Sequence, residues 1–389
     1  MLPAMRRYSV LNYSKRLVAS YVLDWIVIFG FAFIGLGLNY VEPYKRPFSL
    51  VDLSISFPLV DETVSADQAA FICGFGPALV IALVVIIFVP GFAYARANNR
   101  ATLLRVKAWE FEKGWAGLGL GCALAFFITQ GVKNMVGRPR PNMLDRCQPD
   151  LTDIASHVVG GYGQDISIRW TLVSASICTQ QDSYILDDGF RSFPSGHSSF
   201  SWAGMLYLSL FLCSKFAIAI PFMSDRTTSQ VTGMTRSDAH QLLPMHNMNR
   251  ESIDENGPTT QHDKPPDSPS TILTSKDLPM RNHAAAPPNH LLIVALFPIA
   301  VAVWICATRF FEFYHFGTDI LCGSLIGIFS SWFSFRWYHA PIQAGSGWAW
   351  GARSRDRAFG IGVGTRTYVG EEGWLSAKKS DDTTAGFGR

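Results

Sequence analysis

The chain has 389 residues, of which 48% are hydrophobic and only 16% are charged. Soluble domains carry about 25% charged residues, so this composition argues against a purely soluble protein. The formal net charge is only +3, which gives no support for nucleic-acid binding.

Six apolar runs are long enough to cross a bilayer, which takes about 20 mostly apolar residues. In chain order they are residues 18–38, 71–94, 115–135, 200–222, 291–307 and 316–337. Runs this long and uniform predict helices and not the strands of a barrel. We therefore expect an all-α, polytopic membrane protein with six transmembrane helices in a bundle.

The runs divide the chain into five parts. Residues 1–17 carry basic side chains ahead of an apolar run too long for a cleavable signal peptide, which predicts a signal anchor. Residues 224–290 are polar and contain no aromatic residue, so they cannot build a core and predict a disordered loop. This loop separates two parts of a membrane core, 18–223 and 291–338. The polar, Gly-rich tail 339–389 is also expected to be disordered.

The distribution of Lys and Arg predicts the orientation of the chain. Basic residues gather in the N-terminus and between the second and third runs, whereas acidic residues outnumber Lys45 and Arg46 between the first and second. Both termini and the 224–290 loop are thus expected in the cytosol, and residues 137–193 on the luminal or extracellular side. Several Arg in 137–193 argue the other way, although long loops follow the rule poorly. The glycosylation-type triplet at Asn12 would then face the cytosol.

Several residues within the runs have structural explanations. Asp24 and Lys215 are ionisable groups near the expected cytosolic ends, so we expect their side chains to snorkel to the interface. Two glycine pairs with GxxxG spacing allow close helix packing: Gly117/Gly121 and Gly323/Gly327.

Cys147 and Cys178 fall together in the polar region between the third and fourth runs. The chain has no CxxC pair, which argues against a zinc site. Two interpretations stay open: two free thiols, or a disulfide if the region is non-cytosolic.

The sequence RSFPSGHSSF, residues 191–200, stands directly before the fourth run. One interpretation is a serine hydrolase with Ser195 as nucleophile and His197 as base. However, residues two apart on a helix do not face each other, and the GxSxG elbow is absent. The alternative is that Ser195 caps the helix, whose first free N–H groups form an anion site.

Two further clusters lie near Lys133 and Arg140, after the third run, and around Arg309, after the fifth. His315 and Asp319 are four residues apart, so on a helix they share a face, and the carboxylate can accept the imidazole N–H. All three clusters fall on one side of the membrane if the six runs are spans. Three fixed cations and a helix N-terminus on one face indicate a site for phosphate, whose oxygens share the negative charge.

Together these motifs resemble the type-2 phosphatidic acid phosphatase, or lipid phosphate phosphatase, superfamily. The family pattern is K-x6-R-P, then P-S-G-H, then S-R-x5-H-x3-D. It is matched by Lys133…Arg140-Pro141, Pro194-Ser195-Gly196-His197 and Thr308-Arg309…His315…Asp319, with Thr308 in place of Ser. The resemblance covers about residues 52–336. The stretches DRCQPD and DDGFRSFPSGHSS resemble the fungal diacylglycerol pyrophosphate phosphatase branch.

The resemblance implies a mechanism without a metal or other cofactor. His315 attacks phosphorus and forms a phosphohistidine, and Asp319 orients it. His197 protonates the leaving alkoxide and then activates water. The phosphoryl oxygens are held by Lys133, Arg140, Ser195, Gly196 and Arg309.

The sequence thus predicts a phosphatase that releases inorganic phosphate from phosphatidate, lysophosphatidate or diacylglycerol pyrophosphate. Its expected location is the plasma membrane or an endomembrane (vacuole, endoplasmic reticulum or Golgi), with the active site luminal or extracellular. The alternatives are the same chemistry on sphingoid-base phosphates, isoprenoid diphosphates or a soluble sugar phosphate, and an inactive membrane scaffold. A membrane phospholipid is the expected partner, and nucleic acid is not.

Overall fold

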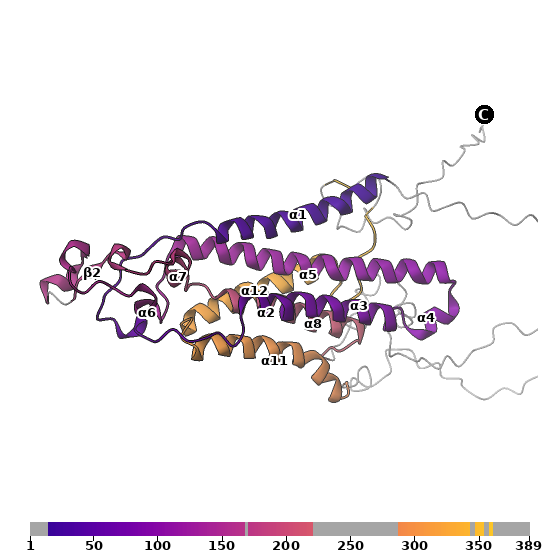
Figure 1. Ribbon diagram of the computed structural model, residues 1–389. Coiled ribbons are helices and arrows are strands. Elements are labelled where there is room, and N and C mark those ends of the chain that lie inside the picture. The colour runs from indigo at the N-terminus through magenta and orange to yellow at the C-terminus, as the bar shows by residue number, and fades with distance from the viewer. Residues whose placement is uncertain (1–14, 168–169, 221–286, 343–346, 354–357, 361–389) are drawn as a thin grey trace, which may run out of the picture.

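The computed structural model describes residues 15–167, 170–220, 287–342, 347–353 and 358–360. These residues form a bundle of long helices with an irregular cap at one end (Figure 1). Almost all of the predicted 224–290 loop, the Asn12 triplet and most of the tail lie outside the described residues.

The bundle consists of six membrane-length stretches of helix. Five are α1 (Lys15–Asn39), α5 (Arg100–Val136), α8 (Gly196–Lys215), α11 (His290–Phe311) and α12 (Gly317–Tyr338). The sixth runs over Ala66–Phe88 as α2 (Ala66–Ala70), a π-helical turn η2 (Phe71–Phe75) and α3 (Gly76–Phe88). The shorter helices are α4 (Phe92–Ala97), α6 (Met143–Cys147) and α7 (Ser183–Gly189). The cap also holds 3-10 turns and an antiparallel pair of strands: η1 (Leu53–Ile55), η3 (Ala155–His157), β1 (Val158–Gly160), η4 (Tyr162–Asp165), β2 (Leu172–Val173) and η5 (Ala175–Ile177).

Within the described residues, five helices are long and apolar enough to cross a membrane: α1, Ala66–Phe88, α5, α11 and α12. The predicted fourth span corresponds to α8, which is not among them. Helix α8 is rich in Ser and Gly, and it packs against α5, α11 and α12 with most of its residues buried. Protein surrounds this helix on several sides, so its sequence does not need to be uniformly apolar.

Caps and prolines set helix boundaries that the apolar runs did not predict. The second helix begins at Ala66 and not at residue 71, because Ser65 forms a capping box with Gln68. It ends at Phe88, just before Pro90. Helix α5 begins at Arg100, well before residue 115, because Asn99 accepts a hydrogen bond from the N–H of Thr102 at 2.8 Å. The basic segment predicted as a loop is therefore largely an extension of α5.

Glycine brings α12 against the first turn of α8. A Cβ on Gly323 would lie 2.4 Å from the backbone oxygen of Ser195, and one on Gly327 would lie 2.3 Å from that of Ser199. Neither distance is possible for a real Cβ, so this approach requires glycine at both positions. The Gly323/Gly327 pair thus fixes the place of the PSGH sequence relative to α12.

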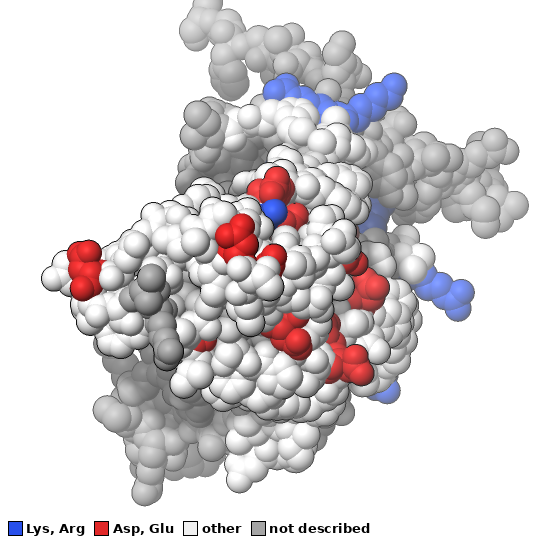
Figure 2. Space-filling view, turned by 60° about the vertical axis from the view of Figure 1, so that its left-hand side comes forward, with Lys and Arg blue, Asp and Glu red and all other residues white. Residues whose placement is uncertain are grey.

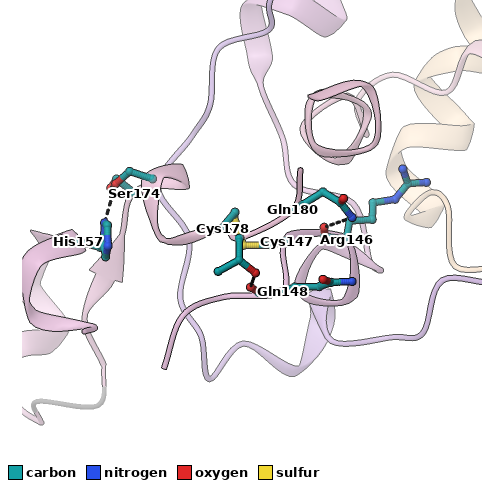
Figure 3. The surroundings of a disulfide bond; sticks show 9 residues. Arg146, Cys147, Gln148, His157, Ser174, Cys178 and Gln180 are labelled. Atoms are coloured by element: carbon teal, nitrogen blue, oxygen red, sulfur yellow. Dashed lines mark hydrogen bonds between the residues drawn. A yellow bond between two sulfur atoms is a disulfide. The ribbon is translucent and has the colours of Figure 1, made fainter. Parts of the chain in front are cut away.

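The cap is formed by residues 40–65, 137–167 and 170–195 and is closed by a disulfide between Cys147 and Cys178 (Figure 3). The disulfide decides between the two interpretations that the sequence left open. Acidic side chains are spread over the cap surface, with little Lys or Arg among them (Figure 2). Three arginines of the cap are instead buried, each only 5% exposed: Arg140, Arg146 and Arg191.

The opposite end of the bundle holds several ion pairs, among them two that bear on predicted residues. Lys215 is fully buried and donates to Glu110, while Asp24 pairs with Arg353 at 2.7 Å. The prediction that Lys215 snorkels is therefore wrong, because its charge is paired with that of Glu110 inside the protein. Residues 347–353 pack back on the bundle, where the N–H of Trp350 donates to the backbone oxygen of Tyr338 at 2.9 Å. This part of the tail is ordered, contrary to expectation.

Candidate active site

The three predicted motifs meet at the cap end of the bundle. Lys133 lies in the last turn of α5, Gly196 and His197 in the first turn of α8, and Arg309 in the last turn of α11. Arg140 follows α5, and His315 occupies the turn between α11 and α12. Figure 1 shows these helix ends beside α6 and α7 of the cap.

Ser195 is the N-cap of α8, as predicted. Its Oγ accepts a hydrogen bond from the N–H of Ser198 at 3.4 Å, and its own N–H donates to the backbone oxygen of Asp319 at 3.0 Å. The first N–H groups of α8 have no partner within the helix. A Cβ on Gly196 would lie 3.4 Å from the Nζ of Lys133, so the ammonium stands close to this helix start.

A cavity of about 520 Å³ opens beside these residues. Four of the predicted site residues line it: Lys133, Arg140, Gly196 and His197. Among the described residues, the Lys133 ammonium forms no hydrogen bond or ion pair, and the Nε2 of His197 is buried without a partner. The remaining wall includes apolar side chains from the membrane-length helices, such as Ala69, Phe126 and Phe200. The cavity therefore suits an amphiphile with an anionic head.

His315 is held differently from the prediction. Its Nδ1 lies 2.7 Å from the backbone oxygen of Ser192 but 3.9 Å from the Oδ2 of Asp319, which is too far for a hydrogen bond. Residues 312–316 form a turn in which Phe313 has φ +61°, and α12 begins only at Gly317. His315 and Asp319 thus do not share a helical face. With Nδ1–H donating to Ser192, the lone pair of the neutral ring is on Nε2.

Asp319 forms hydrogen bonds with other side chains and not with His315. Its buried carboxylate accepts hydrogen bonds from the Oγ of Ser192 and from the Nη1 of Arg138, each at 2.6 Å. Sequence reasoning missed both partners, although Arg138 is the first arginine of the sequence GRPRP and Ser192 stands two residues before Pro194. Their proximity to the known motifs was the available signal.

Arg309 is fully buried and does not line the cavity. It pairs with Glu312, and its Nη1 lies 3.4 Å from the Oε2 of Glu62. The Oγ1 of Thr308 accepts from its Nε at 3.2 Å, so the hydroxyl that replaces serine positions the guanidinium. Ser195, His315 and Asp319 are also not among the residues that line the cavity.

Further residues of the cavity wall were not predicted, among them Arg146, Asp188 and Tyr314. Asp188 joins two guanidinium groups, at 2.6 Å to the Nη2 of Arg140 and 3.0 Å to the Nη1 of Arg146. The ring of Tyr314 has Arg140, Arg146 and Arg309 around it at 5.2–5.4 Å. Arg146 and Asp188 belong to DRCQPD and DDGFRSFPSGHSS, so the signal for them was in stretches already singled out.

Electrostatics favour a neutral His315 and an ionised Asp188. Burial, together with the charges of Arg140 and Lys133, holds the pKa of His315 well below its usual value. Burial alone would raise the pKa of Asp188, but Arg140 and Arg146 lower it overall. The site therefore combines a neutral imidazole with fixed positive charge.

Comparison with known proteins matches residues 114–343 to the PAP2 superfamily. The chain belongs to this superfamily. It is 31% identical to the probable diacylglycerol pyrophosphate phosphatase 1 of Schizosaccharomyces pombe over 55% of this chain and 72% of that protein. It is 24% identical to the probable lipid phosphate phosphatase 4 of Arabidopsis thaliana, over 95% and 89% of the two chains. No solved structure matches this PAP2 chain.

Proposed function

We propose that this protein is an integral-membrane lipid phosphate phosphatase that works through a phosphohistidine on His315 without a metal. The observation that carries the proposal is the cavity itself. Within the part of the chain that the structure describes, Lys133 and the Nε2 of His197 have no hydrogen-bond partner, and both residues line one space with the helix start at Gly196. A neutral His315 is close enough for their charges to lower its pKa. The family match and the names of the relatives agree with hydrolysis of a lipid phosphate.

In the proposed reaction, Lys133, Arg140 and the first N–H groups of α8 hold the phosphoryl oxygens. The Nε2 of His315 attacks phosphorus, the bond to the lipid oxygen breaks, and His197 gives its proton to that oxygen. His197 then takes a proton from water, which attacks the phosphohistidine and releases inorganic phosphate and free His315.

The remaining predicted residues act without lining the cavity. Ser195 caps α8 and so orients the N–H groups that Gly196 begins. Arg309, already paired with Glu312, adds positive charge close to the phosphate. Asp319 positions His315 through Ser192.

For the substrate, we propose phosphatidate, lysophosphatidate or diacylglycerol pyrophosphate. Several apolar side chains that line the cavity, such as Ala69 and Phe126, belong to membrane-length helices, so an acyl chain can stay in the bilayer while the head group reaches the cations. A sphingoid-base phosphate or an isoprenoid diphosphate would meet the same residues. Values of kcat/KM measured side by side on these lipids separate the candidates.

The test of function measures phosphate release from phosphatidate in detergent micelles with EDTA present. Wild-type protein is expected to be active, and His315→Ala to lose several orders of magnitude of activity. Loss of activity on chelation, or full activity of His315→Ala, would contradict the metal-free histidine mechanism. An inactive wild-type protein that still reaches the membrane would support the scaffold alternative.

We further propose six spans, with α8 as the fourth, and a cap on the luminal or extracellular side. The disulfide fits an oxidising compartment. Three of the arginines that argued against this side are buried, Arg140, Arg146 and Arg191, whereas the exposed surface of the cap is acidic. A plasma membrane or endomembrane location follows from this orientation.

Glycosylation tests the orientation. Tyr162 is 84% exposed in the cap, and the double change Tyr162→Asn with Gln164→Thr creates an acceptor triplet there. We expect the variant to be glycosylated in cells, while the natural triplet at Asn12 stays unmodified. Modification at Asn12 and none at position 162 would reverse the orientation.

A further inference from the structure

The cavity contains one more buried cation than the phosphate-binding motifs require. Arg146 lines the cavity, is only 5% exposed and lies outside all three motifs. Its Nε donates to the Oδ1 of Asn142 at 2.9 Å, and its Nη1 faces Asp188 and the backbone oxygen of Ile185. Among the described residues, its Nη2 donates no hydrogen bond.

Arg140 and Arg146 form a matched pair. One carboxylate joins them, with one oxygen of Asp188 facing each guanidinium. Both also lie against the ring of Tyr314, at 5.4 and 5.3 Å. The Nη1 of Arg140, like the Nη2 of Arg146, has no hydrogen-bond partner in the described part of the chain. Two fixed guanidinium groups thus stand next to each other on the wall, each with donors to spare.

The disulfide holds Arg146 in place. Arg146 precedes Cys147 in the short helix α6, and the side chain of Gln180 donates to its backbone oxygen at 3.3 Å. Figure 3 shows the guanidinium pointing away from the disulfide, toward the helices of the bundle. A side chain fixed in this way loses little entropy when it binds an anion.

We propose that Arg146 is a specificity-determining residue that binds the inner phosphate of a lipid diphosphate, while Lys133 and Arg140 hold the outer phosphate. This inference rests on the proposed function and narrows its substrate class to diphosphate head groups. His315 attacks the outer phosphorus, and the bond from that phosphorus to the bridging oxygen breaks. The lipid monophosphate leaves, and Arg146 neutralises the charge that develops on it. Water then releases the outer phosphate from His315.

The experiment compares kcat/KM for diacylglycerol pyrophosphate and for phosphatidate in the same mixed micelles. Removing a hydrogen bond to a charged group is expected to lower kcat/KM by about 10- to 100-fold. We expect Arg146→Gln to lower kcat/KM for the diphosphate by this factor and that for phosphatidate by less than about threefold. Arg146→Lys keeps the charge without the planar guanidinium, so its kcat/KM for the diphosphate is expected to lie between those of the wild type and Arg146→Gln. The matched control is Arg46→Gln, an exposed arginine of the cap that lies outside the cavity.

A second measurement needs no variant and so does not depend on folding. Methylenediphosphonate and inorganic phosphate are compared as inhibitors of phosphatidate hydrolysis by the wild-type protein. We expect the diphosphonate to inhibit at a concentration about tenfold lower. The inference would be overturned if the two inhibitors were equally potent, or if Arg146→Gln lowered kcat/KM equally for both lipids. It would also be overturned if the wild-type enzyme were inactive on the diphosphate. In all three results, hydrolysis of phosphatidate by the wild type leaves the proposed function standing.

Discussion

His315 donates its Nδ1–H to the backbone oxygen of Ser192 at 2.7 Å. This bond selects the tautomer whose lone pair is on Nε2, the nitrogen that attacks in the proposed mechanism. Ser192 in turn donates its Oγ–H to Asp319 at 2.6 Å. The carboxylate is therefore linked to the proposed nucleophile through Ser192 and does not form a hydrogen bond with it directly.

Ser192→Ala tests this indirect arrangement. The substitution keeps the carbonyl that holds His315 but removes the bond to Asp319, so we expect kcat to fall about tenfold with KM nearly unchanged. Asp319→Asn also removes the charge that Arg138 faces, and we expect a loss of about 100-fold or more. Steady-state kinetics on phosphatidate micelles measure both values.

Thr318→Ala is the control for these variants, because it leaves the bond between Ser192 and Asp319 intact. The hydroxyl of Thr318 lies 3.4 Å from Asp319 and accepts a hydrogen bond from the Nη1 of Arg138 at 2.9 Å. The activity of Thr318→Ala should stay within about threefold of the wild type. If Ser192→Ala were as inactive as His315→Ala, or if Asp319→Asn kept full activity, the positioning role would be wrong.

The pH dependence of the first chemical step should reflect the lowered pKa of His315. Burial and the charges of Arg140 and Lys133 hold that pKa well below 6.5. The neutral nucleophile therefore persists as the pH falls through 6.5 and is lost only at the lower pKa of the folded site. We expect kcat/KM to show no acid limb near pH 6.5 with an aryl phosphate, whose leaving group needs no proton from His197.

The ionisation of the aryl phosphate itself is measured by phosphorus NMR and divided out of the profile. In Lys133→Gln, one positive charge near His315 is gone, so the pKa of His315 rises and the acid limb should move to higher pH. An acid limb at pH 6.5 or above in the wild type would falsify the assignment of a neutral, charge-surrounded nucleophile.

The disulfide should contribute to the stability of the cap. Cys147 and Cys178 are separated by 31 residues, and closing such a loop typically stabilises a fold by about 2–4 kcal/mol. The double change Cys147→Ser and Cys178→Ser should lower the thermal unfolding temperature of the purified protein in detergent. It should also reduce activity on the diphosphate more than on phosphatidate, because Arg146 adjoins Cys147.

Cys322→Ser provides the matched control, since Cys322 is a free cysteine in α12. It should leave both the unfolding temperature and the lipid preference unchanged. A double variant that unfolds at the wild-type temperature would show that the bond does not hold the cap.

The sequence predicted the helical bundle well, because long apolar runs reflect local chemistry, and the three motifs that it singled out meet at one end of that bundle. It placed helix starts poorly where a polar cap such as Ser65 or Asn99 extends a helix beyond its apolar run. It also assumed that His315 lies on a helix with Asp319, whereas the turn at Phe313 separates them. The pairing of Asp188 with Arg140 and Arg146 depends on how the cap folds back, and no local pattern contains that information.

The same limit applies to Lys215, whose partner Glu110 is 105 residues away in the chain. Both side chains are buried, and the Oε1 of Glu110 also accepts the N–H of Ala349 at 3.1 Å. Glu110→Gln would leave the Lys215 charge unpaired, so we expect a loss of about 3–5 kcal/mol of stability. Thermal unfolding in detergent measures this loss.

Replacing both members of the pair separates the cost of an unpaired charge from the value of the ion pair. Glu110→Leu with Lys215→Met leaves no buried charge, so stability should return close to that of the wild type. Glu42→Gln, in the exposed pair with Lys45, should change stability little. Phosphatase activity of the folded fraction should be unaltered throughout, because Lys215 lies at the end of α8 opposite His197. A Glu110→Gln protein as stable as the wild type would mean that water or another group reaches the Lys215 ammonium.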